Sequence, residues 1–194
     1  YNALAAENTA VRKALPGSFS WPVSMCQLKR CLLVERVPLE GTEQELVLVN
    51  LHLEAYDSDG GGKKAQTKVL YELLQREYEK GNYVIAGGDF NQTFDTVPED
   101  LYPLKFTDHF MPGRIDTSVL GEGWTFANDV SAPTSRLLNE PYDPDSENTQ
   151  YYMLDGFILS PNVTLTAVKT LDEGFAYTDH NPVRVDVVLD TQND

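Results

Sequence analysis

Six polar residues stand where apolar runs begin or end: His52, Asp89, Asn91, Asp155, Asp179 and His180. A carboxylate can take a proton from water, and a histidine can hold or release one near neutral pH. Side chains at the ends of strands are held by the sheet and still reach solvent, which suits a reactive site. Each residue alone is weak evidence, because a lone histidine or an aspartate after two glycines is usually structural.

The elements that must position these residues alternate between strands and helix. Two β-rich runs, residues 31–37 and 46–53, flank a turn at 40–43 and predict a hairpin. Apolar residues at steps of three and four predict a helix over about 65–80 that packs into the core. Further strands are expected at 83–86, 124–127, 154–159, 163–168 and 183–189.

The remaining segments are irregular. We expect long loops with short strands over residues 92–150, including a solvated acidic loop around Glu140–Glu147, and an irregular lead-in over residues 1–30. No internal repeat or interdomain linker is visible, so residues 1–194 are predicted to form a single domain.

Charge limits the kind of partner. Fifteen basic residues against thirty acidic ones give a net charge of -15, which speaks against a large surface that grips nucleic-acid phosphates. A phosphate substrate remains compatible with this charge, because a bound divalent cation can supply positive charge locally.

Four segments in order carry a family resemblance: Asn50-Leu51-His52-Leu53, Gly88-Asp89-Phe90-Asn91, Leu154–Ser160 and Thr178–Val183. They resemble successive motifs of the endonuclease/exonuclease/phosphatase superfamily, which includes DNase I, inositol polyphosphate 5-phosphatases, sphingomyelinases and deadenylases. Gly-Asp-Phe-Asn and Asp-His-Asn-Pro-Val are the most specific parts.

The resemblance implies a role for each residue. Asp89 would orient and deprotonate water, and Asn91 would hold the water or a phosphoryl oxygen. His180, hydrogen-bonded to Asp155, would stabilise developing charge. His52 would assist the leaving group, as its counterpart does in the DNase-like branch. Asp179 would contribute to a site for Mg²⁺, with Mn²⁺ or Ca²⁺ as other options.

The resemblance also implies a fold and a reaction. The fold would be an α/β (α+β) DNase I-like four-layer sandwich, with two mixed β-sheets face to face and helices outside. The reaction would be metal-dependent hydrolysis of a phosphoester that is a small molecule, lipid-derived or part of a nucleic acid. The acidic composition leans toward the first two.

Several departures from the family pattern matter. Leu51 and Thr178 stand where the family usually has Thr and Ser. The family's first half supplies an Asn and a metal-binding Glu at strand ends, and Asn2, Glu7 and Asn8 lack that context. We therefore expect the C-terminal portion of such a domain, with its N-terminal part missing and self-association through the face left open. The alternative is an inactive family member that acts as a binding module.

One motif imitates the final one. Thr107-Asp108-His109 repeats the Thr-Asp-His order but lacks the following Pro-Val strand. We interpret His109 as structural on that ground.

Overall fold

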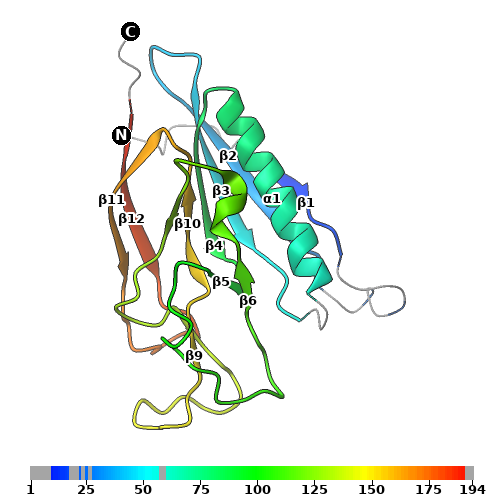
Figure 1. The fold of residues 1–194 in the computed structure, drawn as a ribbon, viewed down its shortest axis with the longest axis vertical. Helices are drawn as coiled ribbons and strands as arrows, with labels where there is room; N and C mark the ends of the chain where they lie inside the picture. Colours follow the sequence, from blue (N-terminus) through cyan, green and yellow to red (C-terminus); the bar gives the residue numbers. More distant parts are fainter. Residues whose placement is uncertain (1–9, 18–21, 23–24, 26–27, 57–59, 191–194) are drawn as a thin grey trace.

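The structure is a computed structural model that describes residues 10–17, 22, 25, 28–56 and 60–190. Its main sheet has six strands in the order β1-β2-β3-β4-β10-β7 (Figure 1). The strands of this sheet are β1 (Val11–Ala14), β2 (Cys31–Pro38), β3 (Glu45–His52), β4 (Tyr83–Asp89), β7 (Thr125–Ala127) and β10 (Asp155–Leu159). β3 and β4 are parallel and the other neighbours are antiparallel.

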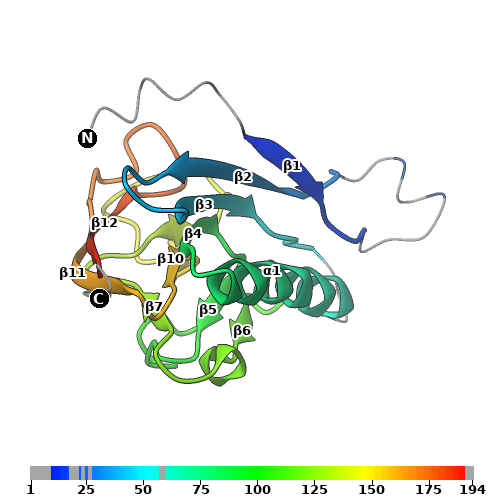
Figure 2. The ribbon, with the colours of Figure 1, turned by 90° about the horizontal axis from the view of Figure 1, so that it is seen from above.

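A single α-helix among the described residues, α1 (Gly61–Glu79), connects β3 to β4. It covers one face of the sheet, where Leu70, Leu73 and Leu74 join a buried cluster with Val47 and Val84 (Figure 2). The helix begins four residues before the predicted start. Gly61 and Gly62 lie in its first turn, where the low helix propensity of glycine costs less than in the helix interior. No helix in the described ranges is long and apolar enough to cross a membrane.

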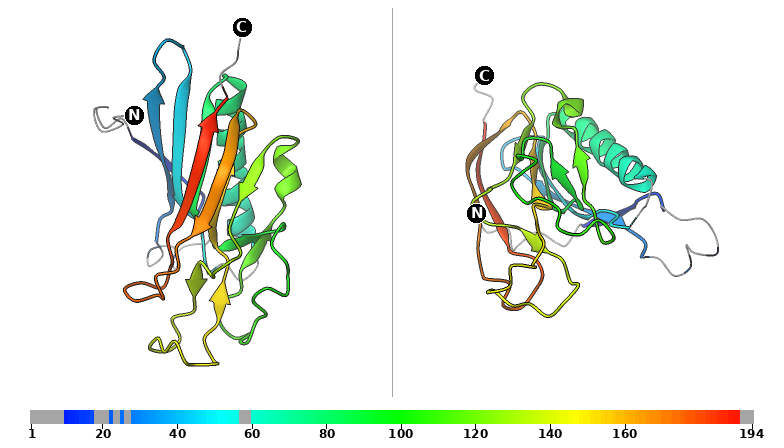
Figure 3. Two further views of the ribbon diagram at one scale, coloured as in Figure 1. Left: turned by 90° about the vertical axis from the view of Figure 1, so that its left-hand side faces the viewer. Right: turned by 60° about the horizontal axis from the view of Figure 1, so that its bottom comes forward.

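A separate antiparallel hairpin covers part of the other face. It consists of β11 (Val163–Thr170) and β12 (Val183–Leu189) and lies across the sheet from α1 (Figure 3). Val185, Val187 and Leu189 pack against Leu48 and Ile85 of the sheet. The alternation of Val with charged residues along β12 predicted this half-buried strand.

The resemblance implied a four-layer sandwich with its N-terminal part missing, and the described residues do not form a complete one. They hold one mixed sheet, one α-helix and the β11–β12 hairpin, because only one segment has a helical apolar period and only two strands stand across from the main sheet. β12 has no strand on its second edge in this part of the chain. The self-association expected through the open face stays a prediction.

The lead-in is more regular than the sequence suggested. β1 pairs with β2 over four residues, from Val11↔Val34 to Ala14↔Cys31, although we expected irregular chain throughout residues 1–30. Lys and Arg interrupt its apolar pattern, and the exposed β2 edge supplies the hydrogen-bonding partner. The positions of Asn2, Glu7 and Asn8 lie outside the described residues.

The loop region contains short elements: β5 (Gln92–Phe94), β6 (Gly113–Ile115), a 3-10 helix (Thr117–Leu120), β8 (Ser135–Arg136) and β9 (Tyr151–Tyr152). β5 pairs with β6 and β8 with β9. The acidic segment 140–147 contains no strand or helix, as predicted. β8 also makes a bridge between Ser135 and His180, which ties this region to the segment before β12.

Candidate functional site

The candidate site lies where three neighbouring strands meet. In the parallel β3–β4 ladder His52 is opposite Asp89, and in the antiparallel β4–β10 ladder Asp155 is opposite Asp89. The last residues of β3 and β4 and the first residue of β10 therefore stand side by side. The sheet register alone brings these three side chains to one edge.

Two glycines allow this close approach of strands. A Cβ at Gly88, whose φ is +141°, would meet the carbonyl oxygen of Leu51, and one at Gly87 would meet the Phe157 ring. A side chain at either position would push β4 away from β3 or from the Phe157 side chain of β10. The glycines before Asp89 thus have a packing role.

Asn91 holds the Asp89 carboxylate in place. Its backbone N–H donates to Asp89 Oδ1 at 2.8 Å, and its Nδ2 donates to Asp89 Oδ2 at 3.2 Å and to the Leu53 carbonyl at 3.0 Å. Asn91 is buried and adopts a left-handed backbone with φ 50°, a conformation that asparagine tolerates better than most residues.

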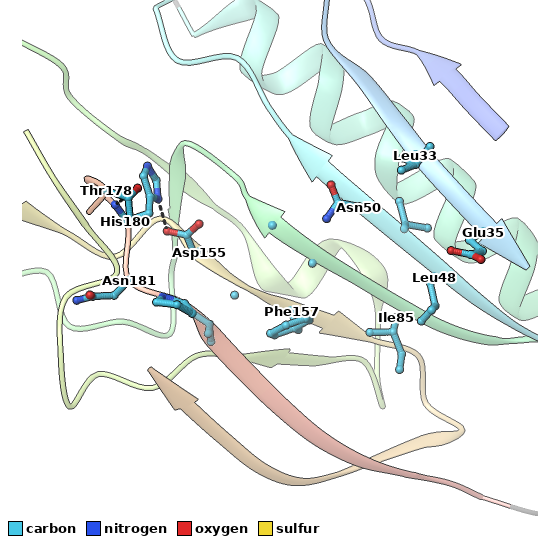
Figure 4. Close-up of a pocket in the computed structure, with 16 residues that line it drawn as sticks. Leu33, Glu35, Leu48, Asn50, Ile85, Asp155, Phe157, Thr178, His180 and Asn181 are labelled. Carbon is cyan, nitrogen blue, oxygen red and sulfur yellow. Dashed lines mark hydrogen bonds and ion pairs between the residues drawn. The ribbon is translucent and has the colours of Figure 1, made fainter. Parts of the chain in front are cut away.

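His180 is anchored on both ring nitrogens. Nδ1 lies 2.9 Å from Asp155 Oδ2, the hydrogen bond drawn in Figure 4. Nε2 lies 3.3 Å from the Ser135 hydroxyl and 3.9 Å from Asp89 Oδ2. Asp155 is itself fixed, because the Thr134 hydroxyl accepts its backbone N–H at 3.1 Å.

His52 completes the group from the other side. Its Nε2 lies 3.3 Å from Asp89 Oδ2, and its side chain is 56% exposed whereas that of Asp89 is 13% exposed. Asp89 is therefore the buried centre of the site, with one histidine on each side.

The environment separates the pKa values of these groups. Burial, and then the charge of Asp155, raise the pKa of Asp89 to about 6. Burial disfavours the charged His180 ring, but the hydrogen bond and charge of Asp155 outweigh it and raise the pKa to about 8. Burial and the charge of Arg30 lower the pKa of His52. Near pH 7 the site thus combines a carboxylate, an imidazolium and a neutral imidazole.

The sixth residue predicted from the sequence is placed differently. Asp179 lines the same cavity, and its charge helps raise the pKa of His180. However, among described residues no cluster of three or more His, Cys, Asp or Glu side chains is close enough to share a metal ion. Asp179 therefore lies beside the site, and its part in a metal site stays a prediction.

A cavity of about 730 Å³ opens over these groups. All three histidines of the chain line it, including His109, which we had interpreted as structural. One wall is aromatic: exposed Tyr56 packs edge-on against Phe110, which packs edge-on against buried Tyr152. A second groove of about 670 Å³ runs from His180 and Asp155 along the open face of β2 and β3 (Figure 4).

Sequence reasoning missed four polar contributors: Thr134, Ser135, Arg30 and Arg136. The first two lie in a segment without apolar periodicity, so their contacts to Asp155 and His180 depend on how the loop folds back. The two arginines line the cavity but belong to none of the four motifs. Nothing in their sequence context distinguishes them from surface arginines.

The Asp155–His180 pair gives a direct test of this electrostatic picture. Asp155→Asn removes the charge that raises the imidazole pKa, so the pKa of His180 should fall from about 8 to near its usual value of about 6.5. NMR titration of the ring in metal-free buffer measures this. Asp186→Asn, on exposed β12, is the control and should leave the titration unchanged. An unchanged midpoint in Asp155→Asn would contradict the geometry.

Comparison with known proteins identifies the fold. Neither family models nor curated protein sequences match the chain. Solved structures do match. Danio rerio TDP2 in complex with a single-strand DNA product has a TM-score of 0.59 at 18% identity, over 92% of this chain and 66% of that one. Over the matched length the chain has the α/β fold of that structure.

Two further matches support this fold assignment. A Beutenbergia cavernae endonuclease/exonuclease/phosphatase has a TM-score of 0.59 at 17% identity, covering 94% of this chain and 45% of that one. The human Nocturnin catalytic domain, with bound sulfate, has a TM-score of 0.56 at 14% identity, covering 93% and 58%. The chain spans about half to two thirds of the length of these three structures.

Proposed function

We propose that this chain carries the acid–base groups of a phosphoester hydrolase. The observation that supports the proposal most is the alignment of His52, Asp89 and Asp155 across three adjacent strands, with His180 hydrogen-bonded to Asp155. The fold match to a TDP2 structure with a DNA product and a Nocturnin structure with sulfate is consistent with an anionic substrate.

In the proposed mechanism Asp89 accepts a proton from the attacking water. Its raised pKa of about 6 makes it a stronger base than an ordinary aspartate and leaves it mostly ionised at pH 7. Asn91 fixes the carboxylate orientation through its backbone and side-chain N–H groups.

The two histidines act on the phosphoryl group and the leaving oxygen. His180, protonated at neutral pH because Asp155 supports its charge, stabilises negative charge on the phosphoryl oxygens. His52 is neutral at this pH, because burial lowers its pKa, and donates an N–H hydrogen bond toward the leaving oxygen.

A divalent cation fits this site only in part. The carboxylates of Asp89, Asp155 and Asp179 offer the oxygen donors that Mg²⁺ prefers, but the described residues contain no three-residue cluster that would hold it firmly. We therefore expect weak Mg²⁺ binding by this chain. This observation also favours a second candidate function, a binding module with the same anion preference and no turnover.

Hydrolysis assays separate the two candidates. We expect slow cleavage of bis(p-nitrophenyl) phosphate. Because Mg²⁺ should bind with a Kd of about millimolar or weaker, the cleavage rate should keep rising up to tens of millimolar Mg²⁺. Asp89→Asn and His180→Gln should each lower the rate by about 10²–10⁴-fold. His109→Gln, which lines the cavity but does not touch Asp89, is the matched control. Absent hydrolysis together with retained phosphate binding would establish the binding module instead.

A further inference from the structure

Two arginines, Arg30 and Arg136, line the cavity that holds the proposed catalytic groups. Arg30 directly precedes β2, and Arg136 is the last residue of β8. Neither forms an ion pair with a described carboxylate, although acidic residues outnumber basic ones by thirty to fifteen in this chain. Two arginines left unpaired at one cavity in such an acidic chain suggest that their partner is an external anion.

Hydrogen bonding singles out the same two residues. In the part of the chain that the structure describes, two buried side-chain nitrogen or oxygen atoms lack a hydrogen-bond partner, and they are the Nε atoms of Arg30 and Arg136. Buried polar groups are nearly always paired, because leaving one without a partner is unfavourable. The Nε atoms of these two guanidinium groups are therefore buried without an internal hydrogen-bond partner that would offset the loss of water.

Arg136 is held in place by its surroundings. Its guanidinium lies 4.7 Å from the centre of the Tyr142 ring, and Nη1 donates to the Leu137 carbonyl at 3.2 Å. Its backbone N–H donates to the Asp179 carbonyl at 3.0 Å, which ties it to the segment that carries His180. A guanidinium fixed in this way loses little freedom when it binds an anion.

Arg30 directly precedes β2, the strand that pairs with β3, which ends at His52. Its charge contributes to the lowered pKa of His52 and opposes the raised pKa of Asp89, so it lies within electrostatic reach of both. Both arginines share one cavity of about 730 Å³ with these groups. That volume is within the usual range for small-ligand sites and exceeds what one phosphoryl group needs.

We propose that Arg30 and Arg136 form a second anion subsite, which binds a phosphoryl group of the substrate other than the one that is cleaved. Because their Nε atoms are shielded, the terminal guanidinium nitrogens make the contacts. The proposal rests on the proposed function, which determines the phosphoryl group that reacts. Anion binding at the subsite itself needs no turnover. The second phosphoryl group could belong to a small bisphosphate or to the adjacent position of a nucleotide chain.

Binding measured without turnover tests the subsite. Calorimetry in metal-free buffer would compare propane-1,3-diyl bisphosphate with propyl phosphate, and the 5′-phosphorylated dinucleotide pdTpdT with thymidine 5′-monophosphate. For at least one pair we expect the wild-type chain to bind the doubly phosphorylated probe about tenfold more tightly. This ratio corresponds to about 1.4 kcal/mol from the added contacts. The pair with the larger ratio identifies the source of the second phosphoryl group.

Variants assign the effect to the two arginines. Arg30→Gln and Arg136→Gln should each bring the ratio close to one, whereas Arg30→Lys, which keeps the charge, should retain part of it. Arg76→Gln is the matched control, since Arg76 lies in the last turn of α1, away from the site edge. Equal affinities for both members of each pair in the wild type, or a ratio that survives Arg136→Gln, would overturn the subsite. Hydrolysis lost in Asp89→Asn while its affinity ratio is retained would support the proposed function separately from the subsite.

Discussion

Asp89→Asn is expected to make the protein more stable at pH 8 while it removes the proposed base. An Asp whose pKa rises from 3.8 to about 6 on folding is harder to ionise in the folded state than in the unfolded state. Its charge therefore lowers stability as pH rises from about 4 to about 6, and the full penalty is present above pH 6. Two pKa units correspond to about 3 kcal/mol.

Part of that gain is lost to a weaker hydrogen-bond arrangement. Asn at position 89 keeps an acceptor for the backbone N–H of Asn91 but gives up the bond from Asn91 Nδ2, which costs about 1 kcal/mol. The net change of about 2 kcal/mol should raise Tm by about 4–8 °C at pH 8 and fade toward pH 4. Thermal unfolding in metal-free buffer at both pH values measures this.

The matched control is Asp186→Asn, since that carboxylate lies half exposed on β12. Its effect should stay within about 0.5 kcal/mol at either pH. A destabilised Asp89→Asn protein at pH 8 would mean that burial and Asp155 do not strain this carboxylate. If Asp89→Asn lost hydrolysis without becoming more stable, Asp89 would act in catalysis without the electrostatic penalty described above.

Local sequence patterns predicted many of the strands but not how much of the second layer the chain contains. Alternation and β-branched runs predicted β2, β3, β10, β11 and β12, because each strand needs one apolar face. The extent of the second layer depended instead on the family resemblance. The chain contains only the β11–β12 pair opposite the main sheet among described residues.

The sequence correctly predicted which residues lie close together where strand ends carry them. His52, Asp89 and Asp155 meet because a sheet register is a regular pattern, so short motifs at strand ends predict proximity. Ser135 and Arg136 reach the site through an irregular loop, whose path depends on contacts such as the Ser135–His180 bridge. Such long-range contacts leave no periodic signal in the sequence.

Gly88→Ala is expected to be among the most destabilising single substitutions in the chain. The new Cβ would meet the Leu51 carbonyl oxygen, and the φ of +141° is unfavourable for any residue with a side chain. Backbone of β3 cannot move aside without breaking the β3–β4 ladder that aligns His52 with Asp89. We expect a loss of more than about 4 kcal/mol, measured by urea unfolding.

Gly87→Ala distinguishes backbone from side-chain crowding. Its Cβ would meet the Phe157 ring, so Gly87→Ala should also destabilise the protein, but Phe157→Ala in the same chain should recover about 2 kcal/mol of the loss. The same Phe157→Ala should give Gly88→Ala no relief, since the obstacle there is backbone. Gly17→Ala, with open space around it, is the control and should change stability by less than about 1 kcal/mol. Recovery of Gly88→Ala by Phe157→Ala would show that the close β3–β4 approach is not what these glycines protect.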